Sequence, residues 1–321
     1  MDIKIGYKLS SEEHPAMDLV ANARKAEEAG FDFALISDHF HPWIDRQGES
    51  PFVWAVLGGI ARETQTLSVG TGVTCPSVRV HPAIVAHAAS TVAAMMPGRF
   101  FLGLGSGENL NEHVHGDQWP QPAQRIEMLE EAIDVITELW KGEKTNHRGT
   151  YYTVQNARLY SLPDSPPPLI VAASGTKAAE LAGRKADGVI STAPDDEVIK
   201  GFEKAGGSDK PRYAEVQVCY AAHEDDAKKT ALEWWPNVGM GGNLSADLES
   251  PAHFDAVAEL VRMEDIQDSI SFGPDPEAHI EGIKKYVDAG YDHLCIHQIG
   301  PDQDSFISFY RDEVIPKIRQ L

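Results

Sequence analysis

The sequence predicts an α/β fold, namely one (β/α)8 (TIM) barrel with insertions after the fourth and the seventh strand. Short apolar runs alternate with amphipathic helical stretches along the whole chain of 321 residues. About eight such strand–helix units can be counted, which suits a closed barrel better than an open, doubly wound sheet. The sequence contains no fixed-period repeat and no low-complexity tract. We therefore expect a single domain over residues 1–321.

The first four units are regular. The first helix, over residues 17–30, ends at Gly30, and glycine readily adopts the left-handed conformation of a helix C-terminus. We expect the four strands over residues 3–7, 33–36, 67–71 and 100–104. We expect the four helices over residues 17–30, 52–63, 83–96 and 124–140.

The alternation is interrupted twice in the second half of the chain. Residues 144–161 resemble a β-hairpin that precedes a proline-rich segment, and residues 238–250 are glycine-rich and loop-like. Between and after these insertions, we expect strands over residues 169–173, 188–192, 215–221 and 293–297. We expect helices over residues 177–185, near Trp234, and over residues 251–262, 276–289 and 305–320.

The composition disfavours several classes of partner. Asp and Glu total 49 against 28 Lys and Arg, so the formal net charge is −21. An acidic surface repels nucleic acid and anionic membranes, and we expect neither as a partner. No apolar run approaches the roughly 18 residues of a membrane-spanning helix, and the first residues are too polar for a signal peptide. Three widely spaced cysteines without a CxxC pair are typical of a cytoplasmic protein.

Polar and titratable residues gather where the predicted strands end. Because the carboxyl ends of barrel strands share one face, we expect these residues to meet in one pocket. An imidazole, a carboxylate and an indole in one pocket are suited to general acid–base catalysis. The residues are Glu12 after the first strand, Asp38, His39, His41 and Trp43 after the second, 72–76 after the third, Ser106, Gly107, Glu108, Asn111 and Glu112 after the fourth, and 174–176, Thr192 and His297 after later strands.

Several of these residues also have a structural interpretation. Because His39 and His41 alternate, one of them could face solvent, and Trp43 could plug the barrel. Glu108 could be an ordinary acid at a helix N-terminus. Residues 174–176 could offer backbone N–H groups to the phosphate of a cofactor, or Thr176 could cap the following helix.

The pair His39 and His41 leaves a different class of function open. Histidines at this spacing after an early strand can bind zinc in hydrolases. The later strands offer mostly Ser, Gly and Thr as further ligands, with His297 the exception. We therefore expect no metal and keep a metal-dependent hydrolase as an alternative. A non-enzymatic binding barrel is a third alternative, which the presence of both His39 and Glu108 disfavours, because binding alone does not need both.

Two motifs resemble a known family. The segments SDHFHPW (residues 37–43) and GSGENLNE (105–112) are similar to those of the luciferase-like barrel superfamily. More narrowly, they resemble the coenzyme F420-dependent dehydrogenases of the glucose-6-phosphate and secondary-alcohol dehydrogenase group. Shorter matches, including residues 74–76, 82–86 and 182–184, extend the resemblance over essentially the whole chain.

The resemblance implies a cofactor, a reaction and a homodimer. It implies F420, with FMN less favoured, and hydride transfer from the carbinol carbon of a small-molecule substrate to C5 of F420. It assigns proton transfer at the substrate hydroxyl group to an imidazole, and proton transfer at the deazaflavin ring to Glu108. It also implies a cis peptide bond at Gly72-Val73, beneath that ring. The implied catalytic residues are His39, Glu108 and Trp43, the implied cofactor-binding residues are Asp38, Gly72, Val73, Cys75, Ser106, Asn111, Ser174, Gly175, Lys177, Ala178 and Thr192, and the implied substrate-binding residues are Glu12, Trp43 and Asp195.

The sequence departs from the sugar-phosphate enzymes of this group. Those enzymes hold the substrate phosphate with two lysines and an arginine, and the matching positions here are Asp195, Ser245 and Ser269. A phosphate group is not held beside an acid when no cation is nearby. The missing cations could be replaced here only by Lys200, Lys204 or Arg79. We therefore expect an uncharged substrate, a small alcohol or an unphosphorylated sugar. A sugar-6-phosphate dehydrogenase with a rearranged phosphate site and an FMN-dependent monooxygenase stay as alternatives.

Overall fold

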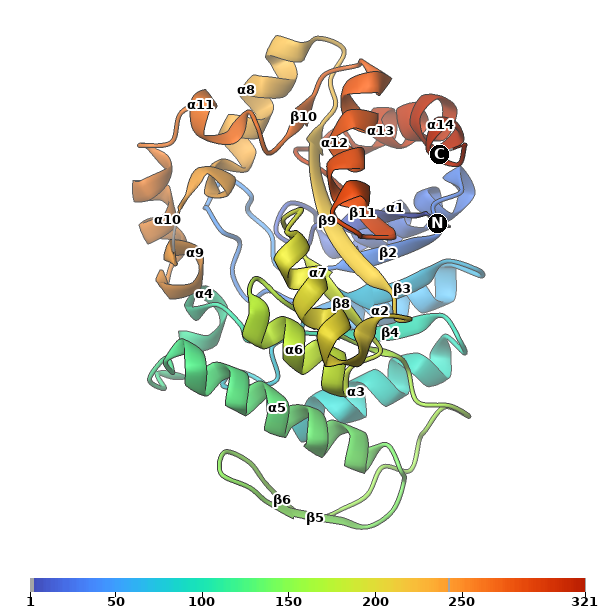
Figure 1. The fold of residues 1–321 in the computed structure, drawn as a ribbon, viewed down its shortest axis with the longest axis vertical. Coiled ribbons are helices and arrows are strands. Elements are labelled where there is room, and N and C mark those ends of the chain that lie inside the picture. Colours follow the sequence, from blue (N-terminus) through green and yellow to red (C-terminus); the bar gives the residue numbers. More distant parts are fainter. Residues whose placement is uncertain (1–2, 242, 321) are drawn as a thin grey trace.

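The structure is a computed structural model that describes residues 3–241 and 243–320. Within these residues, eight parallel strands close into a barrel, because β11 pairs with β1 and β8 pairs with β9 (Figure 1). The predicted (β/α)8 barrel is confirmed. In barrel order, the strands are β1 (Lys4–Leu9), β2 (Phe33–Ile36), β3 (Ser68–Thr71), β4 (Phe100–Leu104), β7 (Leu169–Ala172), β8 (Gly188–Ser191), β9 (Arg212–Cys219) and β11 (His293–Gln298).

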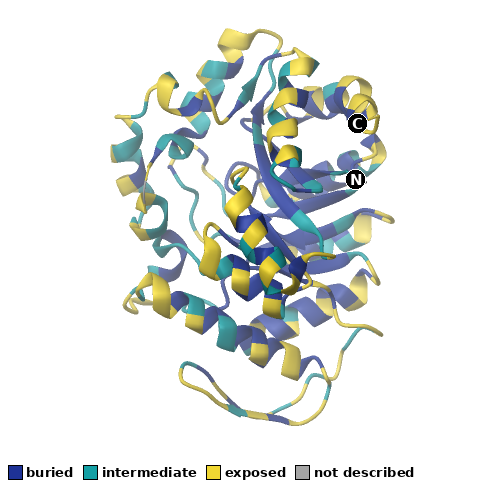
Figure 2. Ribbon diagram, viewed as in Figure 1, coloured by how far each residue is buried: buried dark blue, intermediate teal, exposed yellow. Residues whose placement is uncertain are grey.

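Helices cover the outside of the barrel and turn an apolar face toward it. Figure 2 shows the strands as buried and the outer faces of the helices as exposed. As predicted, α1 ends at Gly30, whose φ of 86° is left-handed. The main covering helices are α1 (Ala16–Ala29), α2 (Val53–Glu63), α3 (Pro82–Met95), α5 (Pro122–Leu139), α6 (Thr176–Lys185), α7 (Asp196–Phe202), α8 (Glu224–Trp234), α12 (Pro276–Asp288) and α13 (Gln303–Phe309). Among the described residues, every helix is too short or too polar to span a bilayer.

The amino-terminal half of the barrel interior is filled by aromatic rings. Phe33 meets Tyr213 edge to face at 5.4 Å between ring centroids, and Phe101 stacks on Tyr213 at 5.3 Å. Gly6 and Gly70 make room for these rings, because a Cβ at either position would stand within 2.4 Å of a ring carbon. This packing closes one end of the barrel and leaves the carboxyl ends of the strands for polar groups.

Two further segments are added to the barrel. The predicted hairpin is present as β5 (Thr145–Arg148) and β6 (Thr153–Ala157), an antiparallel pair beside α5 at the lower edge of Figure 1. A larger segment lies between α8 and α12. It contains α9 (Leu244–Asp247), α10 (Pro251–Ala258), α11 (Met263–Ile266) and β10 (Ser271–Phe272), a short strand that pairs with β9.

Some predicted boundaries were wrong. The segment 238–250 was predicted as a loop but includes α9, the helix predicted to reach residue 262 ends at Ala258, and β9 begins at Arg212 rather than residue 215. The last helix is divided by a π-helical turn, Tyr310–Val314, before α14 (Ile315–Ile318). Pro316 accounts for the break because it has no N–H for a helical hydrogen bond. Residues 1–2, Gly242 in the predicted loop, and Leu321 lie outside the described residues.

Candidate active site

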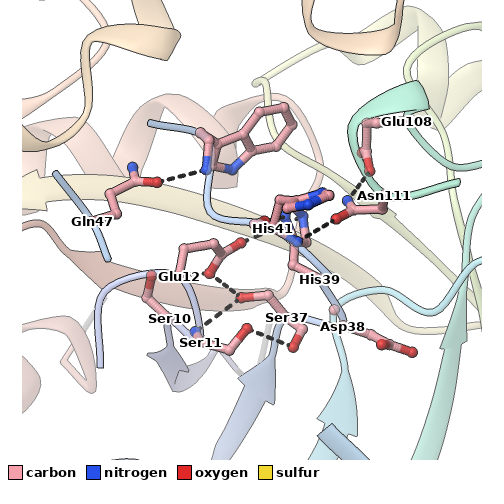
Figure 3. A network of polar contacts seen from close by, with 12 residues as sticks. Ser10, Ser11, Glu12, Ser37, Asp38, His39, His41, Gln47, Glu108 and Asn111 are labelled. Carbon is pink, nitrogen blue, oxygen red and sulfur yellow. Dashed lines mark hydrogen bonds and ion pairs between the residues drawn. The ribbon is translucent and has the colours of Figure 1, made fainter. Parts of the chain in front are cut away.

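His39 follows β2, and each of its two ring nitrogens lies near one oxygen atom (Figure 3). Its Nδ1 is 3.1 Å from the carbonyl oxygen of His41. Because a carbonyl oxygen can only accept, Nδ1 carries the proton in the neutral ring, and Nε2 has the lone pair. Nε2 is 3.4 Å from Oε1 of Glu12. The neutral ring can therefore accept a proton at Nε2, next to a carboxylate that stabilises the product.

Glu12 is a buried carboxylate held by hydroxyl groups. Its Oε2 accepts hydrogen bonds from Ser37 Oγ at 2.6 Å and Ser10 Oγ at 3.1 Å. Burial alone would raise the pKa of Glu12, but attraction to His39 and Lys8 and the Ser37 hydrogen bond lower the pKa below its ordinary value. Glu12 is therefore ionised and ready to pair with a protonated His39.

Trp43 forms an apolar side of the same site. Its indole lies 5.0 Å from the His39 ring and 5.2 Å from the Phe254 ring, measured between centroids. Its backbone N–H donates to Gln47 Oε1 at 2.8 Å, and Gln47 in turn donates to the carbonyl of Trp234 at 2.8 Å. Trp43 is thus half-buried and fixed beside His39, and its role in the reaction stays a prediction.

Glu108 comes from the loop after β4 and is connected to the His39 loop through Asn111. Glu108 is the N-cap residue of α4 (Asn109–Glu112) but makes no capping hydrogen bond. Its Oε2 instead accepts from Asn111 Nδ2 at 3.4 Å, while Asn111 Oδ1 accepts from the backbone N–H of Phe40 at 2.8 Å. Glu108 thus stands at a helix N-terminus, where the structural interpretation placed it, and also reaches the His39 loop through Asn111. Asn111 itself is buried and connects the loop after β2 to the loop after β4.

His41 supports the loop. Its Nδ1 donates to the carbonyl of Leu110 at 2.9 Å, and its ring stacks on His113 at 5.6 Å. Within the described residues, no group of three or more His, Cys, Asp or Glu side chains is arranged to hold a metal ion. The hydrolase alternative therefore lacks a ligand set there.

Asp38 faces away from His39 and is buried in an ion pair. Its Oδ1 is 2.9 Å from Arg79, and its Oδ2 accepts from Thr74 Oγ1 at 2.7 Å. Arg79 also lies 3.5 Å from Glu112, which accepts the backbone N–H of Arg79 at 2.7 Å. Asp38 thus fixes the loop after β3, and its contact with a cofactor stays a prediction.

The loop after β3 begins with Gly72 and Val73, which we call the ledge of the site. The Gly72-Val73 peptide bond is cis, as the resemblance implied. Val73 packs against the backbone of the β4 loop, where a Cβ on Gly105 would stand 2.6 Å from a Val73 methyl group. Cys75 is buried with its Sγ 2.9 Å from Ser77 Oγ, and burial raises the pKa of the Cys75 thiol. Ser106 is half-buried beyond this ledge.

The amino terminus of α6 is open. Gly175 is its N-cap residue and no side chain caps the helix, so the interpretation of Thr176 as the cap was wrong. Ser174, Gly175 and Lys177 are exposed, and a Cβ on Gly175 would meet no atom within 4 Å. The unpaired N–H groups of the first turn are therefore free to bind an anion. Ala178 is half-buried in this turn, and Thr192 is exposed after β8.

The predicted phosphate-binding positions show no set of cations. Asp195 caps α7 by accepting the N–H of Glu197 at 2.9 Å, while Ser245 lies in α9 and Ser269 follows α11. Lys200 forms ion pairs with Asp196 and Glu197 of its own helix. Arg79 is committed to Asp38 and Glu112, and Lys204, like Lys200, is exposed.

Most of the charged residues deeper in the barrel were not singled out from the sequence. Lys8 in β1 pairs with Glu215 in β9 at 2.7 Å, and His297 in β11 lies 2.9 Å from Glu13. Of these, only His297 was a candidate. The signal that could have identified the others is strand alternation, because Lys8 and Glu215 stand two residues after Gly6 and Tyr213 and so face inward with them.

The comparisons with known proteins agree with this geometry. A family model described as luciferase-like monooxygenase matches residues 3–293. Two F420-dependent glucose-6-phosphate dehydrogenases, from Microbacterium testaceum and Nakamurella multipartita, are each 35% identical to this chain. Each alignment covers 99% of this chain and at least 97% of the relative. The solved structure of an F420-dependent secondary alcohol dehydrogenase with an F420–acetone adduct superimposes with a TM-score of 0.93 at 30% identity, covering 99% of both chains. This chain therefore belongs to the luciferase-like family.

Proposed function

We infer that this protein is an F420-dependent oxidoreductase that transfers hydride between a hydroxyl substrate and C5 of F420. Relatives named as F420-dependent dehydrogenases align over 99% of the chain and support this function. The observation that carries it is the pair of His39 and Glu12, with Nδ1 fixed as a donor and Nε2 facing the carboxylate at 3.4 Å. Oxidation of a carbinol requires an acceptor for the hydroxyl proton, and this pair provides one.

The chain also has features that fit an anionic deazaflavin cofactor. When bound, F420 supplies a ring whose C5 accepts hydride from the substrate. We propose that the ledge at Gly72 and Val73 supports the ring and that the uncapped amino terminus of α6 holds an anionic group. The other residues that we propose to hold the cofactor are Asp38, Cys75, Ser106, Asn111, Ser174, Gly175, Lys177, Ala178 and Thr192.

The catalytic roles follow from the contacts of each side chain. His39 accepts the hydroxyl proton at Nε2, and Glu12 stabilises the imidazolium that results. Trp43 lies against the His39 ring and limits the space in which the carbinol can lie. Glu108 is half-buried on the opposite loop, connected by Asn111 to the His39 loop, and manages the proton at the cofactor side.

We propose an uncharged substrate, with a small alcohol preferred over an unphosphorylated sugar. Behind Trp43 lies an apolar cluster of Ile44, Leu110, Met240 and Phe254, which offers no hydrogen-bond partners for sugar hydroxyls. Asp195 would repel a phosphate, and its carboxylate already caps α7. A sugar-6-phosphate dehydrogenase is the second candidate, favoured by the names of the relatives at 35% identity.

A substrate panel tests both candidates. The purified protein would be titrated with F420 and with FMN, and then assayed with F420 and secondary alcohols, sugars and sugar phosphates by the loss of deazaflavin absorbance. We expect F420 to bind more tightly than FMN and alcohols to be oxidised. His39→Gln serves as the control, because it should bind F420 and lose turnover. Absence of F420 binding would refute the function, and turnover with glucose 6-phosphate alone would select the second candidate.

We further propose that the chain is a single domain that works as a homodimer in the cytoplasm. Three exposed apolar side chains near the amino-terminal ends of neighbouring helices support a dimer interface. They are Met17 in the first turn of α1, Phe52 just before α2 and Ile84 in the first turn of α3. The three buried free cysteines are compatible with a reducing compartment. Light scattering of wild-type protein and Phe52→Glu tests the dimer, which we expect the substitution to weaken.

A further inference from the structure

The side-chain amide of Gln47 joins two segments that lie far apart in the sequence. Its Oε1 accepts the backbone N–H of Trp43 at 2.8 Å and that of Ile44 at 3.4 Å (Figure 3). Its Nε2 donates to the carbonyl of Trp234, 187 positions further along the chain, at 2.8 Å. Gln47 is 3% exposed, so these hydrogen bonds lie in a region of low dielectric constant, where they are stronger than in water.

The backbone of Gln47 is placed by hydrogen bonds of its own loop. The Gln47 N–H donates to the carbonyl of Ile44 at 3.1 Å and closes a turn over residues 44–47. Two residues later, the N–H of Glu49 donates to the carbonyl of Glu12 at 3.1 Å, which ties the end of the loop to the segment after β1. The amide of Gln47 is therefore presented from a fixed base.

The carbonyl group that Gln47 reaches is fixed as well. Trp234 is the last residue of α8, and the final carbonyl groups of a helix have no helical partner. The next residue, Trp235, is 4% exposed, and its ring meets the His297 ring of β11 edge to face at 4.3 Å between centroids. The Gln47 amide thus connects the Trp43 loop to a helix end that is packed against the barrel.

The position of the Trp43 indole depends on this connection. The indole lies 5.0 Å from the His39 ring and 5.2 Å from the Phe254 ring of α10, measured between centroids. Ring contacts of this kind tolerate a range of spacings. The hydrogen bond from the Trp43 N–H to Gln47 is more directional, and it fixes the backbone from which the indole projects. Without the amide, the backbone of Trp43 can move and the indole can retreat from His39.

We propose that Gln47 is a positioning residue of the reaction, whose amide holds the Trp43 indole at the distance from His39 that admits a small secondary alcohol. Gln47 acts through Trp43 and needs no contact with the substrate or the cofactor. The end of α8 thereby determines the size of the substrate that fits beside His39. This role rests on the proposed function in that the carbinol lies next to Trp43 and His39.

The first test is 19F NMR of 5-fluorotryptophan-labelled protein without cofactor or substrate. The resonance of Trp43 is assigned by its loss in Trp43→Phe. Gln47→Met keeps the approximate volume of the side chain and removes both hydrogen-bonding groups, so it should shift or broaden the Trp43 resonance. Gln47→Glu is the second variant, in case Gln47→Met does not fold. When ionised, it keeps the acceptor for Trp43 and loses the donor to Trp234, and the same change is expected.

Arg46→Ala is the matched control. Arg46 binds the same helix end from the neighbouring position of the loop, since its guanidinium lies 5.3 Å from the centroid of the Trp234 ring and 2.8 Å from Glu233. The substitution should shift the resonance of Trp234 and leave that of Trp43 unchanged. A role of the loop in merely docking α8 would instead give the same result in Arg46→Ala and Gln47→Met.

The second test is substrate discrimination with F420, which a purely structural role would not change. The ratio of kcat/KM for 2-propanol to that for 2-hexanol should fall at least about threefold in Gln47→Met, because a retreating indole leaves space for the longer chain. Affinity for F420 should stay at the wild-type value, and Arg46→Ala should keep the wild-type ratio.

Three results would overturn the proposal. They are an unmoved Trp43 resonance in the Gln47 variants, an unchanged ratio in Gln47→Met protein that oxidises alcohols, and an equal effect in Arg46→Ala. Failure of the proposed function would appear differently, as wild-type protein that does not bind F420 or does not oxidise either alcohol. Because the NMR test uses neither F420 nor a substrate, it distinguishes the two failures.

Discussion

The substitution Glu12→Gln removes the carboxylate that faces Nε2 of His39 at 3.4 Å. At an effective dielectric constant of about 20, two unit charges at this distance attract by about 5 kcal/mol. Part of that attraction is already offset in the resting protein, because two serine hydroxyls hydrogen-bond to Glu12. If about half of it acts on the transition state, the rate of hydride transfer falls about 50- to 100-fold.

The assay is a single-turnover measurement of deazaflavin absorbance at pH 8, with wild-type and Glu12→Gln protein compared side by side. Ser10→Ala is the matched control, because it removes a 3.1 Å hydrogen bond to Glu12 without changing charge, and we expect less than about a fivefold loss. A rate within about threefold of wild type, in Glu12→Gln protein that folds and binds F420, would refute the reasoning.

Three further outcomes follow from the contacts described above. Phe254→Ala should destabilise the fold by about 3 to 5 kcal/mol in urea and raise KM for alcohols, because Phe254 is fully buried against Trp43; an unchanged KM would separate Phe254 from the site. Gly175→Glu should weaken F420 binding about tenfold or more by fluorescence titration, since it places an anion at the helix terminus, and its Cβ has space, so stability should not change. The pKa of His297 is raised to about 9, so the protonated ring stabilises the fold fully below about pH 6.5, and this stabilisation is lost as the pH rises through 9. The free energy of unfolding should therefore fall by up to about 3 kcal/mol over that range. The fall should be smaller in His297→Gln, which lacks the titrating ring.

The strands of the barrel could be predicted because each carries its own signal. Residues 33–36 and 100–104 are continuous apolar runs, which buried parallel strands require, and the structure places strands over these same residues. The short elements could not be predicted. β10 has two residues and α9 has four, so neither is long enough to show a period, and both are held by tertiary contacts. Pro316 was a visible signal for a break in the last helix.

The candidate site was predictable where residues lie together in sequence. His39 and Trp43 follow one strand, and their rings meet in the structure. Pairs formed between strands were out of reach, because Lys8 and Glu215 stand 207 positions apart and meet only when the barrel closes. Asn111 illustrates a different limit. It was expected to contact the cofactor, and its amide connects Glu108 to the His39 loop, a role that depends on two loops approaching each other.

The arrangement of the barrel interior explains why one carboxylate can act so strongly. Aromatic rings fill the amino-terminal end around Phe33 and Tyr213, so water does not reach the charged layer from that side. Above them, Lys8 and Glu215 pair in a low-dielectric region, where charges interact more strongly than in water. The carboxylate of Glu12 lies 3.4 Å from Nε2 of His39. A proton that arrives at His39 therefore gains an ion pair with Glu12, which favours removal of a hydroxyl proton at the moment when hydride leaves the same carbinol.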